Sequence, residues 1–513
     1  GVSSAASDVY KRQIWDWVDQ GINKYGELSD RYYFGGGFGD KPNDFDFCCN
    51  GIVTPDRQVT PKLIEVKKVY QYIKFKPVEL KAGKVKLENR YDFLNLNQFD
   101  LQWQLLKDGQ IVESGVLSLG DAAPNKDIEV TIPYKTALDA GSEYFLNLSA
   151  RLKKDCNWAN AGHEVASEQY SLTGKIAVAP VDTAFNDTLK VEEEKGQIGF
   201  RAPGFFIAFN PETGKMVSLR YAGTDMIYNK EGFDFNWFRA MDNDKRDYLP
   251  TTVKKQAFDW KQATDKKSVT ITTSLEATVG SGTQKVVLPF DVTYTVYANG
   301  TVDVDATFKA GNDFNLPRLG LQVALNPTLE QVEWYGRGPI ENYWDRKAGY
   351  MIGQYKSTAE EQYFPYVRPQ ENGHHCDTRW ISLGGKGKNL LIVADDEMEF
   401  NAMRNSVEDF DAGKATDRPY QWNNFTPEEI ANRPEIGPYD KPRQTHINDI
   451  APRNFVEVCV DLKQQGLAGY DSWYSRPEPE YTLPADREYK WGFTLIPGAK
   501  ANSAQKKAGY SYK

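Results

Sequence analysis

The stretch DVTYTVYANGTVDVDATF, residues 291–308, decides the fold class. On both sides of Asn299-Gly300, apolar or aromatic residues alternate with polar ones, which is the period of a strand with one buried face. An Asn-Gly pair between two such runs is a strong signal for a β-hairpin. Strand patterns of this kind dominate the chain from residue 190 onward. We therefore expect a mainly β protein in which residues 190–513 form a large antiparallel β-sandwich.

A second β region precedes the first one along the chain. WQLLKDGQIVESGVL carries the hairpin signal Asp108-Gly109. Within EYFLNLSARL, one face of the expected strand carries Tyr144, Leu146, Leu148 and Ala150. About 100 residues of this kind predict an immunoglobulin-like sandwich, which we assign to residues 77–176. The less regular residues 177–189 are interpreted as a linker.

The first part of the chain has a different pattern. IWDWV, residues 14–18, is typical of a strand, and PKLIEVKKVYQYIKF, residues 61–75, is typical of a helix. Thr60 is a suitable N-cap for this helix, with Pro61 in its first position. The apolar face of the expected helix carries Leu63, Val66, Tyr70 and Ile73. Residues 14–76 therefore form a βα unit. Residues 1–13 are small, polar and without period, and we expect them to be a tag or an artefact.

Composition excludes several classes of function. The chain has 513 residues, which predicts two to four domains. Its net charge is −9 and it has no long Lys/Arg block, so neither nucleic acid nor an anionic membrane is expected as a partner. Its longest apolar run, NLLIVA, is far too short to span a membrane. The aromatic content of 13% suits sandwich cores and sugar-stacking platforms equally well.

Metal binding through sulfur is not expected. The five cysteines are scattered, and Cys48-Cys49 lacks the two-residue gap of a zinc or redox motif. His374-His375 with Cys376 offers three donors but no fourth at a suitable spacing. We therefore interpret these histidines as ordinary hydrogen-bonded side chains.

Four irregular stretches between the expected strands are rich in Trp, Tyr, Arg, Asn and Gly. They are FRAMDND (238–244), WYGRGPIENYWDRK (334–347), PYVRPQENGHHCDTRW (365–380) and GYDSWYSRP (469–477). Loops of this kind on a rigid sandwich are frequent binding sites. In the alternative interpretation, their aromatic rings fill the core and their charged groups pair at the loop bases.

These stretches, together with IWDWVDQG and GFGDKPNDFDFCCNGIV, resemble in content and order the C-terminal half of a β-galactosidase of glycoside hydrolase family 2. The resemblance extends from residue 14 to about residue 498. It implies that residues 14–76 are the last βα unit of a (β/α)₈ barrel, followed by an immunoglobulin-like domain and the C-terminal sandwich. It also implies a retaining enzyme that hydrolyses terminal β-D-galactosides such as lactose. The DSW loop favours this branch over β-glucuronidases and β-mannosidases.

The resemblance also implies roles for individual residues. The backbone carbonyl of Phe47 and the side-chain oxygen of Asn50 would ligate a sodium ion that meets the galactose 6-hydroxyl. Asp44 would orient this loop, Trp15 would face the apolar side of galactose, and Trp473 would support the aglycone. A divalent ion, Mg²⁺ or Ca²⁺, is expected in the intact enzyme, bound mostly by residues upstream of this chain.

No catalytic residue is expected in this chain. Retaining glycosidases need two carboxyl groups about 5 Å apart, and the resemblance places both glutamates before residue 14, the first in an Asn-Glu pair. No Asn-Glu pair occurs in the sequence. We therefore expect the chain alone to be inactive and to need a missing N-terminal portion as its partner.

The alternative is a non-catalytic carbohydrate-binding β-sandwich protein. A start inside a βα unit favours the enzyme fragment, because a binding module begins at a domain boundary. The sequence does not decide whether the protein forms a homo-oligomer. It is compatible with a soluble protein of either the cytoplasm or the periplasm.

Overall fold

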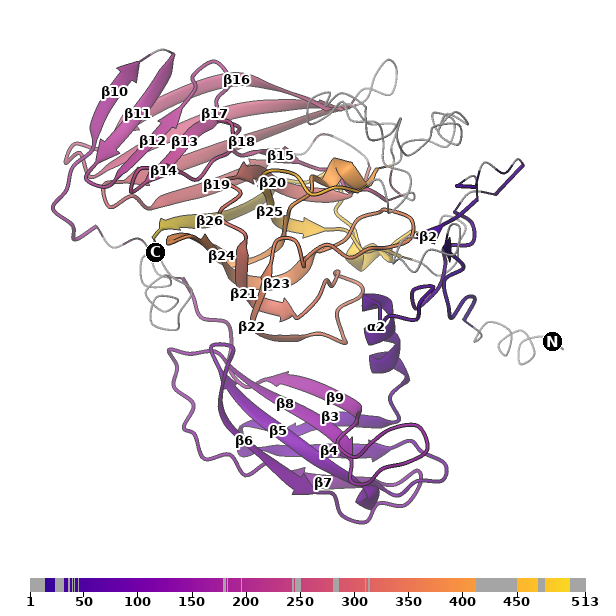
Figure 1. Ribbon diagram of the computed structural model, residues 1–513. Coiled ribbons are helices and arrows are strands. Elements are labelled where there is room, and N and C mark those ends of the chain that lie inside the picture. Colours follow the sequence, from indigo (N-terminus) through magenta and orange to yellow (C-terminus); the bar gives the residue numbers. More distant parts are fainter. Residues whose placement is uncertain are drawn as a thin grey trace.

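The computed structural model shows two β regions, one above the other, with a helix and a loop-rich N-terminal segment beside them (Figure 1). It describes residues 14–498 except 24–31, 36, 39, 41, 45, 179–180, 182, 195, 242–243, 245–250, 280–285, 310, 312–313, 412–449 and 469–475. The expected mainly β class is confirmed. Within these ranges, no helix has the length and apolar character needed to cross a membrane.

The larger region is built on an antiparallel sheet of twelve strands. Its main path runs through β15 (Asp234–Asn236), β20 (Arg318–Leu325), β25 (Val456–Gln464), β24 (Lys388–Met403), β26 (Tyr489–Pro497), β19 (Val302–Phe308), β18 (Val286–Tyr297), β17 (Ser268–Val279) and β16 (Thr251–Gln262). A branch leaves this path at β24 and consists of β23 (His375–Gly385), β21 (Gln331–Gly338) and β22 (Met351–Thr358). The branch carries two of the four irregular loops to the side of the N-terminal segment.

The hairpin predicted at Asn299-Gly300 joins β18 to β19. The two strands pair in register from Val296 opposite Val302 outward, and Gly300 has a φ of 87°, which favours glycine. Tyr294 of β18 is buried and packs against Phe209 in the facing sheet, with 5.0 Å between the ring centroids. The alternation of apolar and polar residues therefore has the predicted effect, since one face of the hairpin fills the core.

The facing sheet has five strands and closes the sandwich. In order these strands are β10 (Lys190–Glu194), β11 (Gln197–Ala202), β12 (Phe205–Phe209), β13 (Met216–Tyr221) and β14 (Thr224–Asp225). Phe200 of β11 meets Trp260 of β16 at 5.7 Å between ring centroids. The outer strands of the twelve-strand sheet and this smaller sheet therefore share one hydrophobic core.

The smaller β region is an immunoglobulin-like sandwich. One sheet contains β3 (Ile73–Glu79), β4 (Lys84–Asn89) and β7 (Asp127–Thr131), and the other contains β6 (Gln110–Ser118), β5 (Phe99–Lys107), β8 (Tyr144–Leu152) and β9 (Glu164–Ser171). Asp108 and Gly109 both have positive φ, as the predicted two-residue hairpin requires. All four residues predicted for the inward face of β8 are buried. Short 3₁₀ helices occur at η2 (Leu80–Ala82), η3 (Leu96–Gln98), η6 (Val407–Phe410) and η9 (Pro479–Tyr481).

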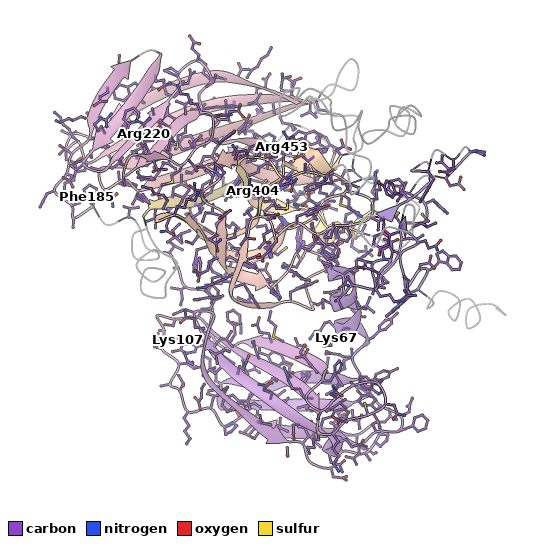
Figure 2. All side chains as sticks on the ribbon, viewed as in Figure 1. Lys67, Lys107, Phe185, Arg220, Arg404 and Arg453 are labelled. Atoms are coloured by element: carbon purple, nitrogen blue, oxygen red, sulfur yellow. The ribbon has the colours of Figure 1, made fainter. Side chains whose placement is uncertain are left out.

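The two β regions meet in a small mixed core. Leu106 and Phe145 of the immunoglobulin-like sandwich pack with Tyr335 and Trp380 of the larger region. The helix α2 (Pro61–Tyr70) lies at the side of this boundary (Figure 1). Its Lys67 pairs with Glu164 of β9 at 3.1 Å (Figure 2). Its Pro61 carbonyl accepts a 2.7 Å hydrogen bond from the Tyr350 hydroxyl, so the helix contacts both β regions.

Two local predictions in the N-terminal segment are wrong. Residues 14–18 form no strand, and only Val18 makes a bridge, a parallel one to Val53. A barrel strand forms hydrogen bonds to neighbours on both sides, whereas the described residues supply one side alone. Among the described residues of this segment, the only strands are the two-residue pair β1 (Ile22–Asn23) and β2 (Tyr32–Tyr33).

The helix is also shorter than predicted. Thr60 caps it and Pro61 opens it, as predicted, but it ends at Tyr70. Gln71 is extended, and Ile73 then points into the immunoglobulin-like core as the first residue of β3. Burial of Ile73 and Phe75 at strand spacing outweighs the helical period of the sequence.

Candidate functional site

The loop of residues 46–53 is held beside the segment that carries Trp15. Val53 donates its N–H to the Trp17 carbonyl at 2.9 Å, and Asp19 donates its N–H to the Val53 carbonyl at the same distance. Ile52 adds a third backbone bond to Asp16 at 3.0 Å. These parallel contacts place two of the predicted site segments side by side.

Phe47 and Asn50 are brought into contact by a tight turn. The Asn50 carboxamide donates a hydrogen bond of 3.2 Å to the Phe47 carbonyl. The Asn50 side-chain oxygen is buried and has no hydrogen-bond partner among the described residues. The Asn50 side-chain oxygen and the Phe47 carbonyl are oxygen donors of the kind that a hard cation takes, and the Asn50 oxygen is a buried acceptor that lacks a donor. In this structure the Asn50 amide nitrogen, not its oxygen, faces the Phe47 carbonyl. The residues present therefore fit the implied sodium site, although the roles of Phe47 and Asn50 stay a prediction.

The structure gives fewer contacts for the other residues predicted to bind substrate, Trp15, Asp44 and Trp473. The Trp15 side chain is 79% exposed, so its ring is free to meet a ligand. Asp44 is exposed, and its backbone carbonyl accepts the Phe47 N–H at 3.3 Å. Trp473 lies outside the described residues. The functions assigned to all three stay predictions.

A cation that sequence reasoning missed anchors the loop. Arg368 donates from Nε to the Asp46 carboxylate at 2.5 Å, and the Arg368 side chain is only 9% exposed. Arg368 belongs to the PYVRPQENG stretch of the larger β region, so this contact joins two motifs far apart in the chain. The only feature of the sequence that could have indicated this ion pair is an Arg between two prolines in a loop rich in aromatic residues.

Lys62 of α2 also contacts the loop of residues 46–53. Lys62 of α2 donates to the Gly51 carbonyl and lies 5.5 Å from the centre of the Tyr366 ring. Burial lowers the pKa of Lys62, while the nearby Asp19 carboxylate opposes that shift. Burial also raises the pKa of Asp19, which accepts a 3.3 Å hydrogen bond from the Gly51 N–H. Asp19 and Lys62 thus fix both backbone groups of Gly51.

Two carboxylates, Glu341 and Asp345, hold the irregular loops of the larger β region to one another. Glu341 accepts hydrogen bonds from the Gly373 N–H at 2.7 Å and from Arg346 at 2.8 Å. Asp345 accepts the N–H groups of Leu467 and Ala468, each at 2.8 Å. The Asp345 contacts fix the chain just before residues 469–475, the stretch that contains Trp473.

The loop of residues 238–244 is held at its base by a buried ion pair and backbone hydrogen bonds. The buried Arg239 pairs with Asp244 at 2.7 Å and donates to the Gln465 carbonyl at 2.5 Å. The Ala240 carbonyl accepts the Glu371 N–H at 2.9 Å. Pairing at the loop bases, the alternative weighed from the sequence, therefore accounts for most of these Arg, Asp and Glu residues. It leaves Trp15 and the Phe47–Asn50 turn as the exposed part of the site.

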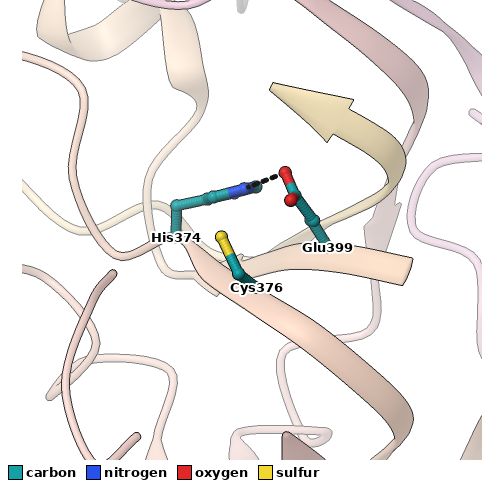
Figure 3. Close-up of side chains that lie close together, drawn as sticks. All are labelled: His374, Cys376 and Glu399. Atoms are coloured by element: carbon teal, nitrogen blue, oxygen red, sulfur yellow. Dashed lines mark hydrogen bonds and ion pairs between the residues drawn. The ribbon is translucent and has the colours of Figure 1, made fainter. Parts of the chain in front are cut away.

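The histidine and cysteine cluster is a buried network of hydrogen bonds (Figure 3). The ligand atoms of His374, Cys376 and Glu399 lie within 4.8 Å of one another, and all three residues are buried. His374 contacts the Glu399 carboxylate at 3.0 Å through one ring nitrogen and Asn401 at 2.9 Å through the other. Burial lowers the pKa of His375 to about 3, which keeps that ring neutral. The prediction of hydrogen-bonded histidines is confirmed.

The comparisons with known proteins place the chain in a family. The profile of the β-galactosidase small chain matches residues 201–495, more than half of the chain. The chain belongs to this β-galactosidase family. Two further profiles match, β-galactosidase domain 4 over residues 85–173 and the TIM barrel domain of glycosyl hydrolases family 2 over residues 4–75. The resemblance to glycoside hydrolase family 2 and the order of its last three domains are thereby confirmed, and the barrel match starts at residue 4, inside the segment 1–13.

Curated proteins with similar sequences are named β-galactosidase. A β-galactosidase of Priestia megaterium is 33% identical over 94% of this chain, and one of Vibrio cholerae is 30% identical over 96%. The chain spans about 44% and 45% of the length of these two relatives. Among solved structures, a galactose 1-epimerase from Lactobacillus acidophilus covers 61% of this chain at 9% identity and a TM-score of 0.27. That value is too low to support any argument.

Proposed function

We propose that this chain is the C-terminal portion of a retaining β-galactosidase that hydrolyses terminal β-D-galactosides such as lactose. The observation that carries the proposal is the buried, unpartnered side-chain oxygen of Asn50 in the turn that begins at Phe47, next to the backbone that presents Trp15. Family membership and the β-galactosidase name of the relatives support it. The chain itself contributes one wall of the pocket and no catalytic carboxylate.

Each part of this wall has a distinct task in the proposal. Phe47 and Asn50 would hold a sodium ion, which supplies a positive charge to the galactose 6-hydroxyl when it is bound. Trp15 would stack on the apolar C–H face of the sugar, since an aromatic ring suits that face. Trp473 would support the aglycone. Arg368 holds the loop through Asp46, so the larger β region sets the position of the sugar site.

The proposal includes components outside this chain. The two catalytic glutamates and most ligands of a divalent ion, Mg²⁺ or Ca²⁺, would come from a preceding barrel portion. That portion is then the main partner of this chain, and β-galactosides are the substrates of the intact enzyme.

The test uses the intact enzyme, in which this chain follows the barrel portion. Asn50→Ala removes one oxygen ligand, so we expect the response of KM to sodium to weaken and the preference for galactose over 6-deoxygalactose to fall about fivefold to tenfold, equivalent to about 1–1.4 kcal/mol. Asn43→Ala is the matched control, because Asn43 lies three residues before this loop and donates to the Asp40 carbonyl at 2.8 Å. If Asn50→Ala and Asn43→Ala respond alike to sodium, the metal role of the loop is wrong.

Trp473→Ala tests the outer part of the pocket separately. Loss of a stacking face costs about 1–2 kcal/mol, or about fivefold to thirtyfold in KM. We expect this loss for lactose and an unchanged response to sodium. An equal change in the sodium response of both variants would contradict the division of roles.

A further inference from the structure

The two adjacent cysteines of the loop have no task in the proposed function. A sodium ion takes oxygen ligands, so the thiols of Cys48 and Cys49 are not its donors. Both residues are free and partly exposed, whereas Cys376 and Cys459 are buried. Cys156 is exposed but stands alone, with its thiol on the Ala159 carbonyl at 3.4 Å. Cys48 and Cys49 are therefore the only neighbouring pair of thiols in the sequence that solvent can reach.

The local geometry brings the two sulfur atoms together. The turn is closed by hydrogen bonds from the Phe47 N–H to the Asp44 carbonyl at 3.3 Å and from the Cys49 N–H to the Asp46 carbonyl at 2.8 Å. The side chains of Cys48 and Cys49 interact with each other. Side chains of consecutive residues in an extended strand point in opposite directions. It is the turn, not the adjacency alone, that lets the thiols meet.

We propose that Cys48 and Cys49 form a reversible redox site, which a hydroperoxide such as hydrogen peroxide oxidises to a disulfide between the two neighbours. This inference goes beyond the proposed function and does not depend on it.

The reaction needs only the two thiols and the peroxide. The Cys48 sulfur attacks one peroxide oxygen, the O–O bond breaks, and the leaving hydroxide takes the thiol proton to become water. Cys48 is then a sulfenic acid. The Cys49 sulfur attacks the Cys48 sulfur, the S–OH bond breaks, and the departing hydroxide takes the Cys49 proton as a second water. The protein loses two hydrogen atoms, that is two protons and two electrons, and the peroxide is reduced to two waters.

The disulfide is expected to be easily reduced. Consecutive Cα atoms are held about 3.8 Å apart by the peptide bond, closer than the roughly 4.4–6.8 Å that unstrained disulfides prefer. Strained and exposed disulfides are the labile ones.

The first experiment treats the full chain with hydrogen peroxide and maps its peptides by mass spectrometry without reduction. We expect the peptide that contains both cysteines to lose two hydrogen atoms and to regain them with dithiothreitol. Cys156→Ser, the control, should behave like the parent. Cys48→Ser and Cys49→Ser should lose this product and add oxygen at the remaining thiol instead. Addition of oxygen to the parent peptide without loss of hydrogen, or no reaction there while Cys156 oxidises, would overturn the proposal.

A second measurement needs no variant. Phenylarsine oxide, a trivalent arsenical, binds tightly only where two thiols reach the same arsenic atom. We expect one equivalent to bind the parent chain and to protect the pair from peroxide, and dithiothreitol to remove it. If the reagent does not bind, or if it binds Cys48→Ser as tightly as the parent, the two thiols do not act together and the proposal fails.

Discussion

Arg379 is expected to hold the two β regions together, and its replacement by Met tests this directly. Arg379 on β23 donates to both carboxylate oxygens of Glu143, at 2.7 and 3.0 Å, and the two side chains are 7% and 5% exposed. Without Arg379, the Glu143 carboxylate keeps only the Tyr335 hydroxyl, at 2.6 Å, as a side-chain partner among the described residues. Removal of one member of a buried ion pair costs about 3–5 kcal/mol.

Glu143→Gln should cost less than Arg379→Met. In that variant, Arg379 retains Glu397 at 3.1 Å and the Asp377 carbonyl at 2.5 Å, so we expect about 1–3 kcal/mol. The double variant should cost less than the sum of the two single ones, with a coupling of about 0.5–3 kcal/mol. An additive double variant would mean that the two groups do not act as a pair.

The assay is urea unfolding followed by hydrogen-exchange mass spectrometry, which reports β5 and β8 separately from β23 and β24. Lys107→Met is the matched control, because Lys107 and Asp139 form an exposed ion pair at 2.5 Å on the same sandwich, worth about 0–1 kcal/mol. We expect Arg379→Met to let β5 and β8 open at a lower urea concentration than β24. If Arg379→Met and Lys107→Met lower the midpoint equally, the buried pair does not hold the boundary.

Three further predictions follow from burial, backbone strain and exposure. Burial, with a contribution from Glu408, raises the pKa of Glu457 to about 8; the folded state therefore binds a proton more tightly than the unfolded one, and stability falls as pH rises from about 4.5 to about 8. Glu457→Gln should thus raise Tm at pH 8.5 and change it little at pH 5, and a gain at pH 5 alone would contradict the sign. Gly109→Ala should destabilise more than Gly204→Ala in thermal unfolding, because both glycines have positive φ but only the Cβ at 109 would clash, at 2.7 Å from the Tyr335 ring; equal losses would reduce the effect to backbone strain. Amides of residues 46–53 should exchange before those of β24, since few of them lie in a sheet, and equal protection of the two sets of amides would contradict this expectation.

The parts of the fold that depend on neighbouring residues were predictable from the sequence. The hairpins at Asp108-Gly109 and Asn299-Gly300 need positive φ in their turns, and the flanking alternation fixes which side chains are buried. The cap at Thr60 and the start at Pro61 are equally local. By contrast, the strand expected at residues 14–18 depends on neighbours that the pattern itself does not reveal.

Contacts between distant residues were not predictable from the pattern. Glu143 and Arg379 are 236 residues apart, and each looks like an ordinary surface charge in the sequence. The same holds for Asp46 and Arg368, whose ion pair positions the candidate site. Phe47 and Asn50 were named through resemblance, and the structure brings them together in one turn without testing the role of either residue.

The most direct measurement of the central claim is the hydrolysis of a chromogenic β-galactoside by two purified proteins. One is this chain alone, and the other is the same chain preceded by the barrel portion that the proposal requires. We expect no turnover by the chain alone, because the proposed function places both catalytic glutamates in the barrel portion, and turnover by the longer protein with a clear preference for the β-galactoside over the matching β-glucoside. Turnover by the chain alone, or a folded longer protein that hydrolyses neither compound, would contradict the assignment of this chain as the C-terminal wall of a β-galactosidase pocket.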